Sequence, residues 1–305
     1  MMEDFRKMFA EAFRLVRLRA PLVHNVTNYV AMAPSANALL AVGASPLMSS
    51  AASEMDEISA VSDALVVNIG CIDEGQAEAM RIAAAAACRL GKPWVLDPVG
   101  VGLSRLRTDT ALELMEEYRP SVIRGNASEV MTLAGVEAGR RGVDSAEDSL
   151  AALDSAVELA RSCGSVVSVS GPVDCITDGR RIIKIFNGSP LMPKVTAMGC
   201  SASSLTAAFA AVRELKLSQP PRSPFQGEDM SPLPWAPYDG GSAPITPRAP
   251  LELAAAAMAL MGVAGEIAAA NSSGPGSFAS AFIDALYLLD PAEAAEMIRY
   301  EERTA

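Results

Sequence analysis

Short apolar segments that end in Gly, Pro or Asn alternate with helical segments in the amino-terminal part of this chain. The apolar segments are GASPLM (43–48), ALVVNIG (64–70), KPWVLDPVG (92–100) and PSVIRGN (120–126), and helical stretches lie at about 53–62, 75–90 and 108–118. Strands that are apolar throughout are typical of a parallel sheet covered on both faces. The alternation therefore predicts an α/β fold, with a central, mostly parallel sheet and helices on both faces in a three-layer sandwich.

The carboxyl-terminal part continues this pattern, and we expect a single domain over 1–305. Further strands are predicted at 165–171, 175–179 and 180–188, with a hairpin turn at TDG, and helices at about 199–214, 249–270 and 276–289. The segment 217–250 is rich in Pro, Gly and Ser and has no hydrophobic period, which is typical of a flexible insert. We interpret it as an insertion between two helices, because the helices after it lack a core of their own.

Charge, cysteine and histidine content argue against several classes of function. The 305 residues include 25 Lys and Arg against 36 Asp and Glu, a net charge of −11, and no basic block, so we expect no nucleic-acid partner. Acids and bases interrupt the segment 1–20, which predicts neither a signal peptide nor a membrane span. Five scattered cysteines without a CxxC pair are typical of reduced thiols in a cytoplasmic protein. The single histidine, His24, would have to serve any His-based metal site or Ser/His/Asp triad, and we expect it to be structural.

Several predicted strands end in residues that could contact a ligand. These are Met48, the run Asn68-Ile69-Gly70, the pair Asp97-Pro98 and the run Arg124-Gly125-Asn126. In an open parallel sheet, ligands bind at the carboxyl ends of the strands. The clustering indicates a site along this edge of the sheet.

Two carboxylates and an arginine give this edge its predicted chemistry. Carboxylate oxygens suit Mg²⁺, and a guanidinium binds phosphate through paired hydrogen bonds. Asp97, Glu129 and Arg124 together favour a magnesium-bound polyphosphate, with Glu129 holding the metal through water. Simpler interpretations stay open, because Asn126 and Glu129 have the spacing of a helix-capping box. The alternatives for the other two residues are a solvated turn residue for Asp97 and a surface charge for Arg124.

The segment KVTAMGCSASS (194–204) brings small residues to the start of a predicted helix. We expect its first backbone N–H groups to form an anion hole, which comprises Ala197, Met198, Gly199 and Cys200. Because a helix N-terminus lowers the pKa of a thiol, Cys200 is a candidate catalytic residue. The alternative is a small buried cysteine. The nucleotide-binding patterns GxGxxG and GxxxxGK[ST] are absent from the sequence.

Taken together, these motifs resemble the hydroxyethylthiazole kinase family, ribokinase-like enzymes of thiamine salvage. The resemblance is carried in order by PLVHNVTNYVAMAPSANALLAVGASPLM, ALVVNIG, WVLDPVGVG, RGNASEV, VSGPVDCITDG, VTAMGC and GPGSF. It covers about 20–214 and resumes near 251. It implies transfer of the ATP γ-phosphate to the hydroxyl of 4-methyl-5-(2-hydroxyethyl)thiazole with Mg²⁺, by a homotrimer whose thiazole sites lie between subunits.

The resemblance also implies a role for each matching position. Thiazole contacts fall on Met48, Ala197, Asn25 and Gly70, and ATP contacts fall on Arg124, Ser170 and Asn126. The acidic residues around Mg²⁺ are Asp97 and Glu129. Cys200 stands where most ribokinase-like kinases have an aspartate base, so we expect it to act as a weak base or to position the alcohol.

This chain departs from the family pattern at two places, and the first of them bears on substrate preference. The family usually reads VTGTGC, whereas this chain has Ala197 and Met198, and the segment 217–250 is an added insert. The alternatives are a hydroxymethylpyrimidine-type kinase, a ribokinase-like nucleotide-dependent dehydratase, or a non-catalytic protein of this fold. The first two are expected to carry an aspartate where this chain has Cys200, and the retained Asp97, Arg124 and Glu129 argue against the third.

Overall fold

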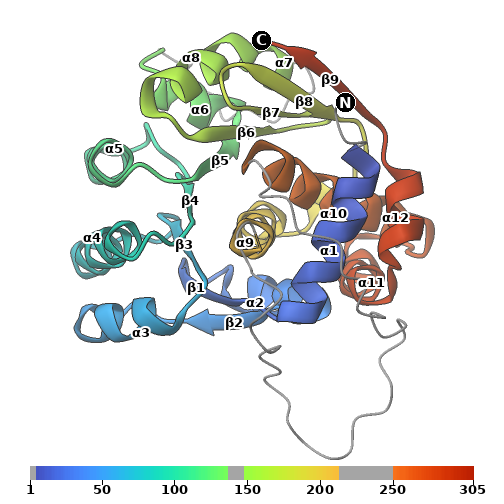
Figure 1. The fold of residues 1–305 in the computed structure, drawn as a ribbon, viewed down its shortest axis with the longest axis horizontal. Coiled ribbons are helices and arrows are strands. Elements are labelled where there is room, and N and C mark those ends of the chain that lie inside the picture. The colour runs from blue at the N-terminus through green and yellow to red at the C-terminus, as the bar shows by residue number, and fades with distance from the viewer. Residues whose placement is uncertain (1–4, 137–147, 213–249) are drawn as a thin grey trace, which may run out of the picture.

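The structure, a computed structural model, describes residues 5–136, 148–212 and 250–305 (Figure 1). Within these residues the strands form one sheet in the order β2-β1-β3-β4-β5-β6-β7-β8-β9. Strands β1 to β6 run parallel, and the pairs β6–β7, β7–β8 and β8–β9 are antiparallel. The bounds are β1 Leu22–Val26, β2 Ser45–Met48, β3 Ala64–Asn68, β4 Trp94–Asp97, β5 Val122–Asn126, β6 Val166–Ser170, β7 Asp174–Thr177, β8 Arg181–Ile185 and β9 Tyr300–Thr304.

Helices cover both faces of this sheet, as Figure 1 shows. One core contains side chains of α1 Phe5–Arg19, α2 Met32–Ala41, α9 Met198–Ala211, α10 Pro250–Ala270, α11 Pro275–Leu288 and α12 Pro291–Met297. The core on the opposite face contains side chains of α3 Met55–Val61, α4 Glu74–Arg89, α5 Arg105–Tyr118, α6 Ala127–Leu133 and α8 Leu153–Cys163; the short α7 Asp148–Ala151 precedes α8. The two separate cores confirm the predicted three-layer arrangement.

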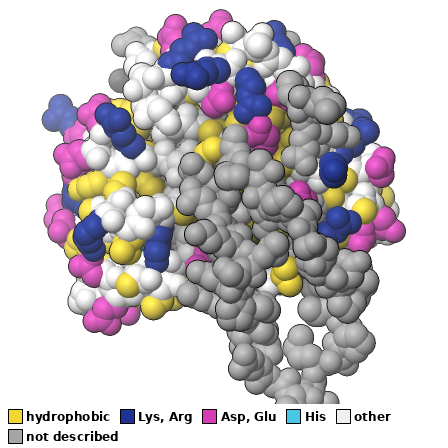
Figure 2. Space-filling model, viewed as in Figure 1, with side chains coloured by type: hydrophobic (Ala, Val, Ile, Leu, Met, Phe, Trp, Pro, Cys, Tyr) yellow, Lys and Arg dark blue, Asp and Glu magenta, His cyan; other side chains and the backbone are white. Residues whose placement is uncertain are grey.

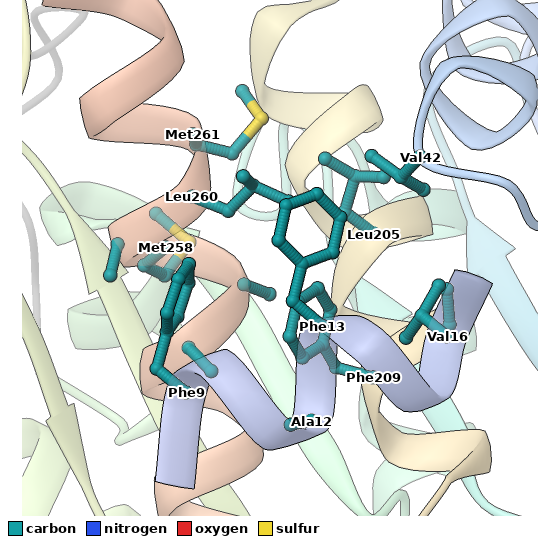
Figure 3. Close-up of a cluster of buried hydrophobic side chains, with 14 of the residues drawn as sticks. Phe9, Ala12, Phe13, Val16, Val42, Leu205, Phe209, Met258, Leu260 and Met261 are labelled. Carbon is teal, nitrogen blue, oxygen red and sulfur yellow. The ribbon is translucent and has the colours of Figure 1, made fainter. Parts of the chain in front are cut away.

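Helix α9 lies against the middle of the sheet and is fixed by aromatic packing on its outer side. Phe209 packs on Phe13 and Phe9 of α1, with ring centroids 6.2 and 6.5 Å apart (Figure 3). Leu205 joins the same cluster. The small buried residues Ser203 and Ser204 of α9 hydrogen-bond to Asp97 of β4 and Asn25 of β1, so the helix approaches these strands closely. The packing fixes where the N-terminus of α9 lies.

Helix α10 is long and apolar enough to cross a membrane, but 78% of its most apolar window is buried inside the protein. It packs against α9, α11 and α1. Its composition therefore reflects a central core helix.

On the face in view in Figure 2, the Lys and Arg side chains of the described residues are interspersed with Asp and Glu side chains.

The predicted strands correspond to β2 through β8, and the predicted helices to α3, α4, α5, α9, α10 and α11. The predicted strands and helices did not include β1, β9, α1, α2, α7, α8 and α12. The predicted flexible insert lies outside the described residues, apart from Pro250, which begins α10.

Candidate active site

The carboxyl ends of the parallel strands bring the predicted residues together along one edge. The strand register places Asn68 of β3 opposite Asp97 of β4. It also places Asn126 opposite Ser170, the last residues of β5 and β6. The clustering expected from the strand ends is therefore present, and the N-terminal half of α9 packs beneath β3 and β4.

The N-terminus of α9 is open. Ala197 is the N-cap residue, with φ of 64°, and no side chain caps the helix. The Ala197 carbonyl accepts from the Ser201 N–H at 2.8 Å, whereas the N–H groups of residues 198–200 have no hydrogen-bond partner among the described residues. These free donors and the positive end of the helix dipole form the backbone arrangement that an anion hole requires.

Arg124 of β5 lies directly against this helix terminus. A Cβ added to Gly199 would lie 2.6 Å from Arg124 Nη1, so a larger residue at this position would displace the guanidinium from the helix terminus. Arg124 is 8% exposed, and its guanidinium donates no hydrogen bond to any described residue. A buried cation without a hydrogen-bonded partner is costly. Arg124 is therefore not the surface charge of the alternative interpretation, and its donors are available to an anion at the start of α9.

Asp97 is the buried carboxylate of the site, 1% exposed. Its Oδ2 accepts from Asn68 Nδ2 at 2.6 Å and from Ser203 Oγ at 2.9 Å. Its Oδ1 is buried and has no partner among the described residues. Burial raises the pKa of Asp97, an effect opposed by the nearby charge of Arg124. The interpretation of Asp97 as a solvated turn residue is thus wrong.

Glu129 completes a capping box at the start of α6. Asn126 Oδ1 accepts from the Glu129 N–H, and Glu129 Oε2 accepts from the Asn126 N–H, both at 2.9 Å. The second oxygen, Oε1, accepts from the Gly100 N–H at 2.9 Å. Burial raises the pKa of Glu129, and the charge of Asp97 adds to the rise. The capping interpretation is confirmed, and metal binding by Glu129 stays a prediction.

The prediction that the helix N-terminus lowers the pKa of the Cys200 thiol is wrong. Burial raises the pKa of the Cys200 thiol to about 11, and the charge of Asp97 contributes to the rise. Two amides oppose this rise in pKa because they donate hydrogen bonds to the sulfur: Asn68 Nδ2 at 3.2 Å and Asn28 Nδ2 at 3.5 Å. The helix terminus does not outweigh burial beside a carboxylate. At neutral pH Cys200 is therefore a protonated thiol.

Residues expected at the thiazole pocket lie near the first strands. Asn25 of β1 is fully buried, donates to the Val23 carbonyl at 2.9 Å and accepts from Ser204 Oγ at 2.8 Å. These bonds use one of the two hydrogens of the amide nitrogen and one of the two acceptor positions of its oxygen. Met48 ends β2 opposite Asn25 and is half-buried. Gly70 leaves room for Asn28, since an added Cβ would lie 2.6 Å from Asn28 Nδ2.

His24 takes the structural role expected of it. It is fully buried in β1, with Nε2 3.2 Å from the Ser49 carbonyl. Because a carbonyl only accepts, Nε2 is the protonated nitrogen. Burial lowers the pKa of His24 to about 4, so the ring is neutral at physiological pH.

Three site residues escaped the sequence patterns. Asn28 and Ser203 hydrogen-bond within the site, and Arg107 of α5 donates to the Ile69 and Val99 carbonyls at 2.8 and 2.6 Å, joining the loops after β3 and β4. The sequence placed Asn68 at a strand end without indicating a role for it. Of the three missed residues, only Ser203 had a signal in the sequence, the run SASS in a largely apolar helix.

Replacing Ala197 by glycine is expected to stabilise the protein by about 1 kcal/mol, because a left-handed conformation is unfavourable for alanine and free for glycine. Urea denaturation measures the gain. Ala20 supplies a matched control, since it also has a positive φ, 44°, in the turn after α1. Ala20→Gly should stabilise the protein without altering substrate KM, whereas Ala197→Gly should change both. An unchanged or lower stability for Ala197→Gly contradicts the assigned backbone conformation.

The stability of the protein is expected to depend on pH through Asp174 of β7. Burial raises the pKa of Asp174 from 3.8 to about 7, although Asp174 Oδ1 accepts from the Gly171 N–H at 3.0 Å. Between these values the folded protein holds more protons than the unfolded chain, so stability falls as pH rises.

Asp174→Asn is expected to remove this fall. The variant should match wild type below pH 4 and exceed it above pH 7 by up to about 4 kcal/mol. Urea denaturation from pH 4 to 8 tests this, with the exposed Asp284→Asn as control. Parallel curves for wild type and Asp174→Asn would rule out the assigned shift.

Comparisons with known sequences identify one family throughout. A family model described as the hydroxyethylthiazole kinase family matches residues 13–220. A curated hydroxyethylthiazole kinase from Nitratidesulfovibrio vulgaris is 46% identical over 284 residues, 93% of this chain and 94% of the relative. Another from Brachyspira hyodysenteriae is 40% identical over 298 residues, 98% of this chain and 100% of the relative.

Solved structures agree with the sequence comparisons. The structure of a hydroxyethylthiazole kinase protein from Pyrococcus horikoshii OT3 superposes with a TM-score of 0.79 at 34% identity, covering 97% of this chain and 99% of that one. A pyridoxal kinase from Staphylococcus aureus has a TM-score of 0.55 at 15% identity, covering 93% and 99%, and shares the fold. The predicted ribokinase-like fold, the family and the transferase class are confirmed.

Proposed function

Because the chain belongs to the hydroxyethylthiazole kinase family, we propose that it transfers the γ-phosphate of ATP to the hydroxyl of 4-methyl-5-(2-hydroxyethyl)thiazole in thiamine salvage. One observation carries the proposal. Arg124 is a buried guanidinium without a hydrogen-bonded partner among the described residues, and it lies against Gly199 at the open N-terminus of α9. An anionic phosphate satisfies both groups at once.

Phosphoryl transfer depends mainly on alignment and on neutralising charge at the phosphoryl oxygens. Arg124 and the backbone N–H groups of residues 198–200 hold the triphosphate and receive the transferring group. Because these donors are fixed by the β5 backbone and by the core packing of α9, they need little rearrangement when charge shifts. Ser170 and Asn126, paired at the ends of β6 and β5, contact ATP in this proposal.

The acidic residues suit Mg²⁺. The unpartnered Asp97 Oδ1 is a hard oxygen ligand, and Asp97 raises the pKa of Glu129, a repulsion that a divalent cation relieves. Within the described residues no group of three or more His, Cys, Asp or Glu could hold a metal. We assign Asp97 as a direct ligand, because its Oδ1 has no partner among the described residues, and Glu129 as a ligand through water, because both of its oxygens already accept backbone N–H bonds. Bound Mg²⁺ supplies positive charge to the phosphate oxygens.

The acceptor alcohol lies in this proposal beside Met48, Ala197 and Gly70, next to Cys200.

The enzyme is proposed to be a cytoplasmic homotrimer. Tyr29 and Val30, directly after the site residue Asn28, are 63% and 59% exposed, as a subunit contact beside the pocket requires. Sedimentation should give three times the chain mass of 31.8 kDa, and a monomer mass would reject the trimer.

Cys200 is expected to position the alcohol rather than accept its proton, because its thiol stays protonated at neutral pH. Cys200→Ala should lower kcat by about 2- to 10-fold, the range of one neutral hydrogen bond. Cys200→Asp should keep or raise kcat by restoring a carboxylate. Profiles of kcat from pH 6 to 9 should have the same shape for wild type and Cys200→Ala. An ionisation that disappears in Cys200→Ala would show that the thiol is the base.

The function is tested by measuring ADP formation by purified protein with Mg-ATP and a panel of small alcohols. ADP release that depends on hydroxyethylthiazole supports the proposal. Release only with a hydroxymethylpyrimidine assigns the chain to the rival alcohol kinases. No release with any alcohol favours the non-catalytic alternative.

A further inference from the structure

Asn68, the last residue of β3, links the two halves of the site. It is 1% exposed and lies between the Asp97 carboxylate and the Cys200 thiol. Asp97 belongs to the phosphate half, and Cys200 belongs to the half that receives the alcohol. The position of Asn68 at a strand end does not by itself indicate what the residue does, but its hydrogen bonds do.

The orientation of the Asn68 amide is fixed by its oxygen. Asn68 Oδ1 accepts from Asn28 Nδ2 at 2.8 Å and from the Gly70 N–H at 3.0 Å. Because both partners are donors, the oxygen must face them, and the nitrogen must face the site. Asn68 Nδ2 then donates one hydrogen to Asp97 Oδ2 at 2.6 Å and the other to Cys200 Sγ at 3.2 Å. All four hydrogen-bonding positions of the amide are used.

Asn68 thereby determines which atoms of its two neighbours face the site. Asn68 and Ser203 both donate to Asp97 Oδ2, so the carboxylate cannot rotate without losing both bonds, and Oδ1 is left for a ligand. Asn68 and Asn28 both donate to Cys200 Sγ, so the thiol hydrogen points away from both amides. Asn28 is itself anchored, because its Oδ1 accepts from the Ala31 N–H at 3.0 Å.

We propose that Asn68 is a positioning residue for phosphoryl transfer, whose amide holds the Asp97 carboxylate and the Cys200 thiol in a fixed mutual orientation. The inference rests on the proposed function. It predicts that loss of the amide lowers the rate of transfer much more than it lowers substrate binding or folding stability. A purely structural amide would instead affect stability and binding together.

Asn187, after β8, is a matched control. It is 4% exposed, and its Nδ2 donates to the Glu266 carboxylate at 3.1 Å and to the Met297 carbonyl at 3.0 Å. Its Oδ1 accepts from the Arg299 N–H at 2.7 Å. It is therefore a buried amide bonded to a carboxylate, like Asn68, but β8 is separated from β3 by four intervening strands.

The experiment compares Asn68→Ala, Asn68→Ser and Asn187→Ala with wild type in the full chain. It measures kcat and both KM values with Mg-ATP and hydroxyethylthiazole, binding of hydroxyethylthiazole alone by calorimetry, and the melting temperature. We expect kcat to fall about 10- to 100-fold in Asn68→Ala, the effect of losing a residue that orients a metal-binding carboxylate. Thiazole affinity should stay within about threefold, less than 1 kcal/mol. Asn68→Ser, which retains one donor, should recover part of kcat, and Asn187→Ala should retain wild-type kcat.

The outcomes separate this inference from the proposed function. An inactive wild-type protein rejects the function itself. An active wild type with unchanged kcat in folded Asn68→Ala overturns the positioning role. A loss of thiazole affinity and melting temperature in step with kcat also overturns it, because that is the structural outcome. If Asn68→Ala does not fold, Asn68→Ser decides by the same criteria.

Discussion

Arg124→Met is expected to lower kcat/KM for ATP by about 100- to 1,000-fold, the loss typical for one preorganised donor to a developing anion. The structure gives the reason. Arg124 contributes a buried cation at the start of α9 that no described residue engages in a hydrogen bond, so its binding capacity is directed at a ligand. Methionine fills similar volume but offers neither charge nor N–H groups. Steady-state kinetics with Mg-ATP and hydroxyethylthiazole measures the loss.

A second readout separates lost binding from lost folding. Mg-ATP should raise the melting temperature of wild type, and this shift should vanish in Arg124→Met, whereas any shift caused by hydroxyethylthiazole should persist. The exposed Arg105→Met is the control and should behave as wild type in both assays. An undiminished ATP shift in Arg124→Met would contradict the assignment of Arg124 to the phosphates.

Asp97→Asn is expected to reduce kcat by at least about 100-fold, since charge stabilisation through a metal site contributes several kcal/mol. The exchange leaves the local structure intact. An asparagine oxygen still accepts from Asn68 and Ser203, and the new NH₂ takes the place of the unpartnered Oδ1. The change therefore removes a charged ligand atom without removing a packing group.

Binding measurements identify the cause of this loss. Calorimetry with ATP should show that Mg²⁺ strengthens nucleotide binding to wild type and strengthens it less in Asp97→Asn. The exposed Asp284→Asn should match wild type. Equal dependence on Mg²⁺ in Asp97→Asn and wild type would exclude Asp97 as a metal ligand.

Much of the fold was predictable because its strands are apolar throughout and end in turn residues. ALVVNIG and PSVIRGN give β3 and β5 in this way. Strand β1 escaped because His24 and Asn25 interrupt its apolar run. Their burial depends on partners far along the chain, the Ser49 carbonyl and Ser204 Oγ. Such pairings are tertiary contacts, which strand propensity does not contain.

The site residues also divide into those that strand positions predict and those that depend on tertiary contacts. Because parallel strand ends meet at one edge of the sheet, the sequence correctly predicted that Asp97, Arg124 and Glu129 lie close together. The connections through Asn28 and Ser203 depend on how closely α9 approaches the sheet. The thiol was misjudged for the same reason. The helix terminus is visible in sequence, but the burial of Cys200 and its neighbour Asp97 are not.

The proposed phosphoryl transfer is tested most directly by identifying the product by ³¹P NMR after incubation of the protein with Mg-ATP and hydroxyethylthiazole. We expect a phosphate monoester of the thiazole alcohol, formed in equal amount to ADP. Arg124→Met and Asp97→Asn should form this product far more slowly. Inorganic phosphate in place of the monoester, or no phosphorus transfer from ATP, would contradict it.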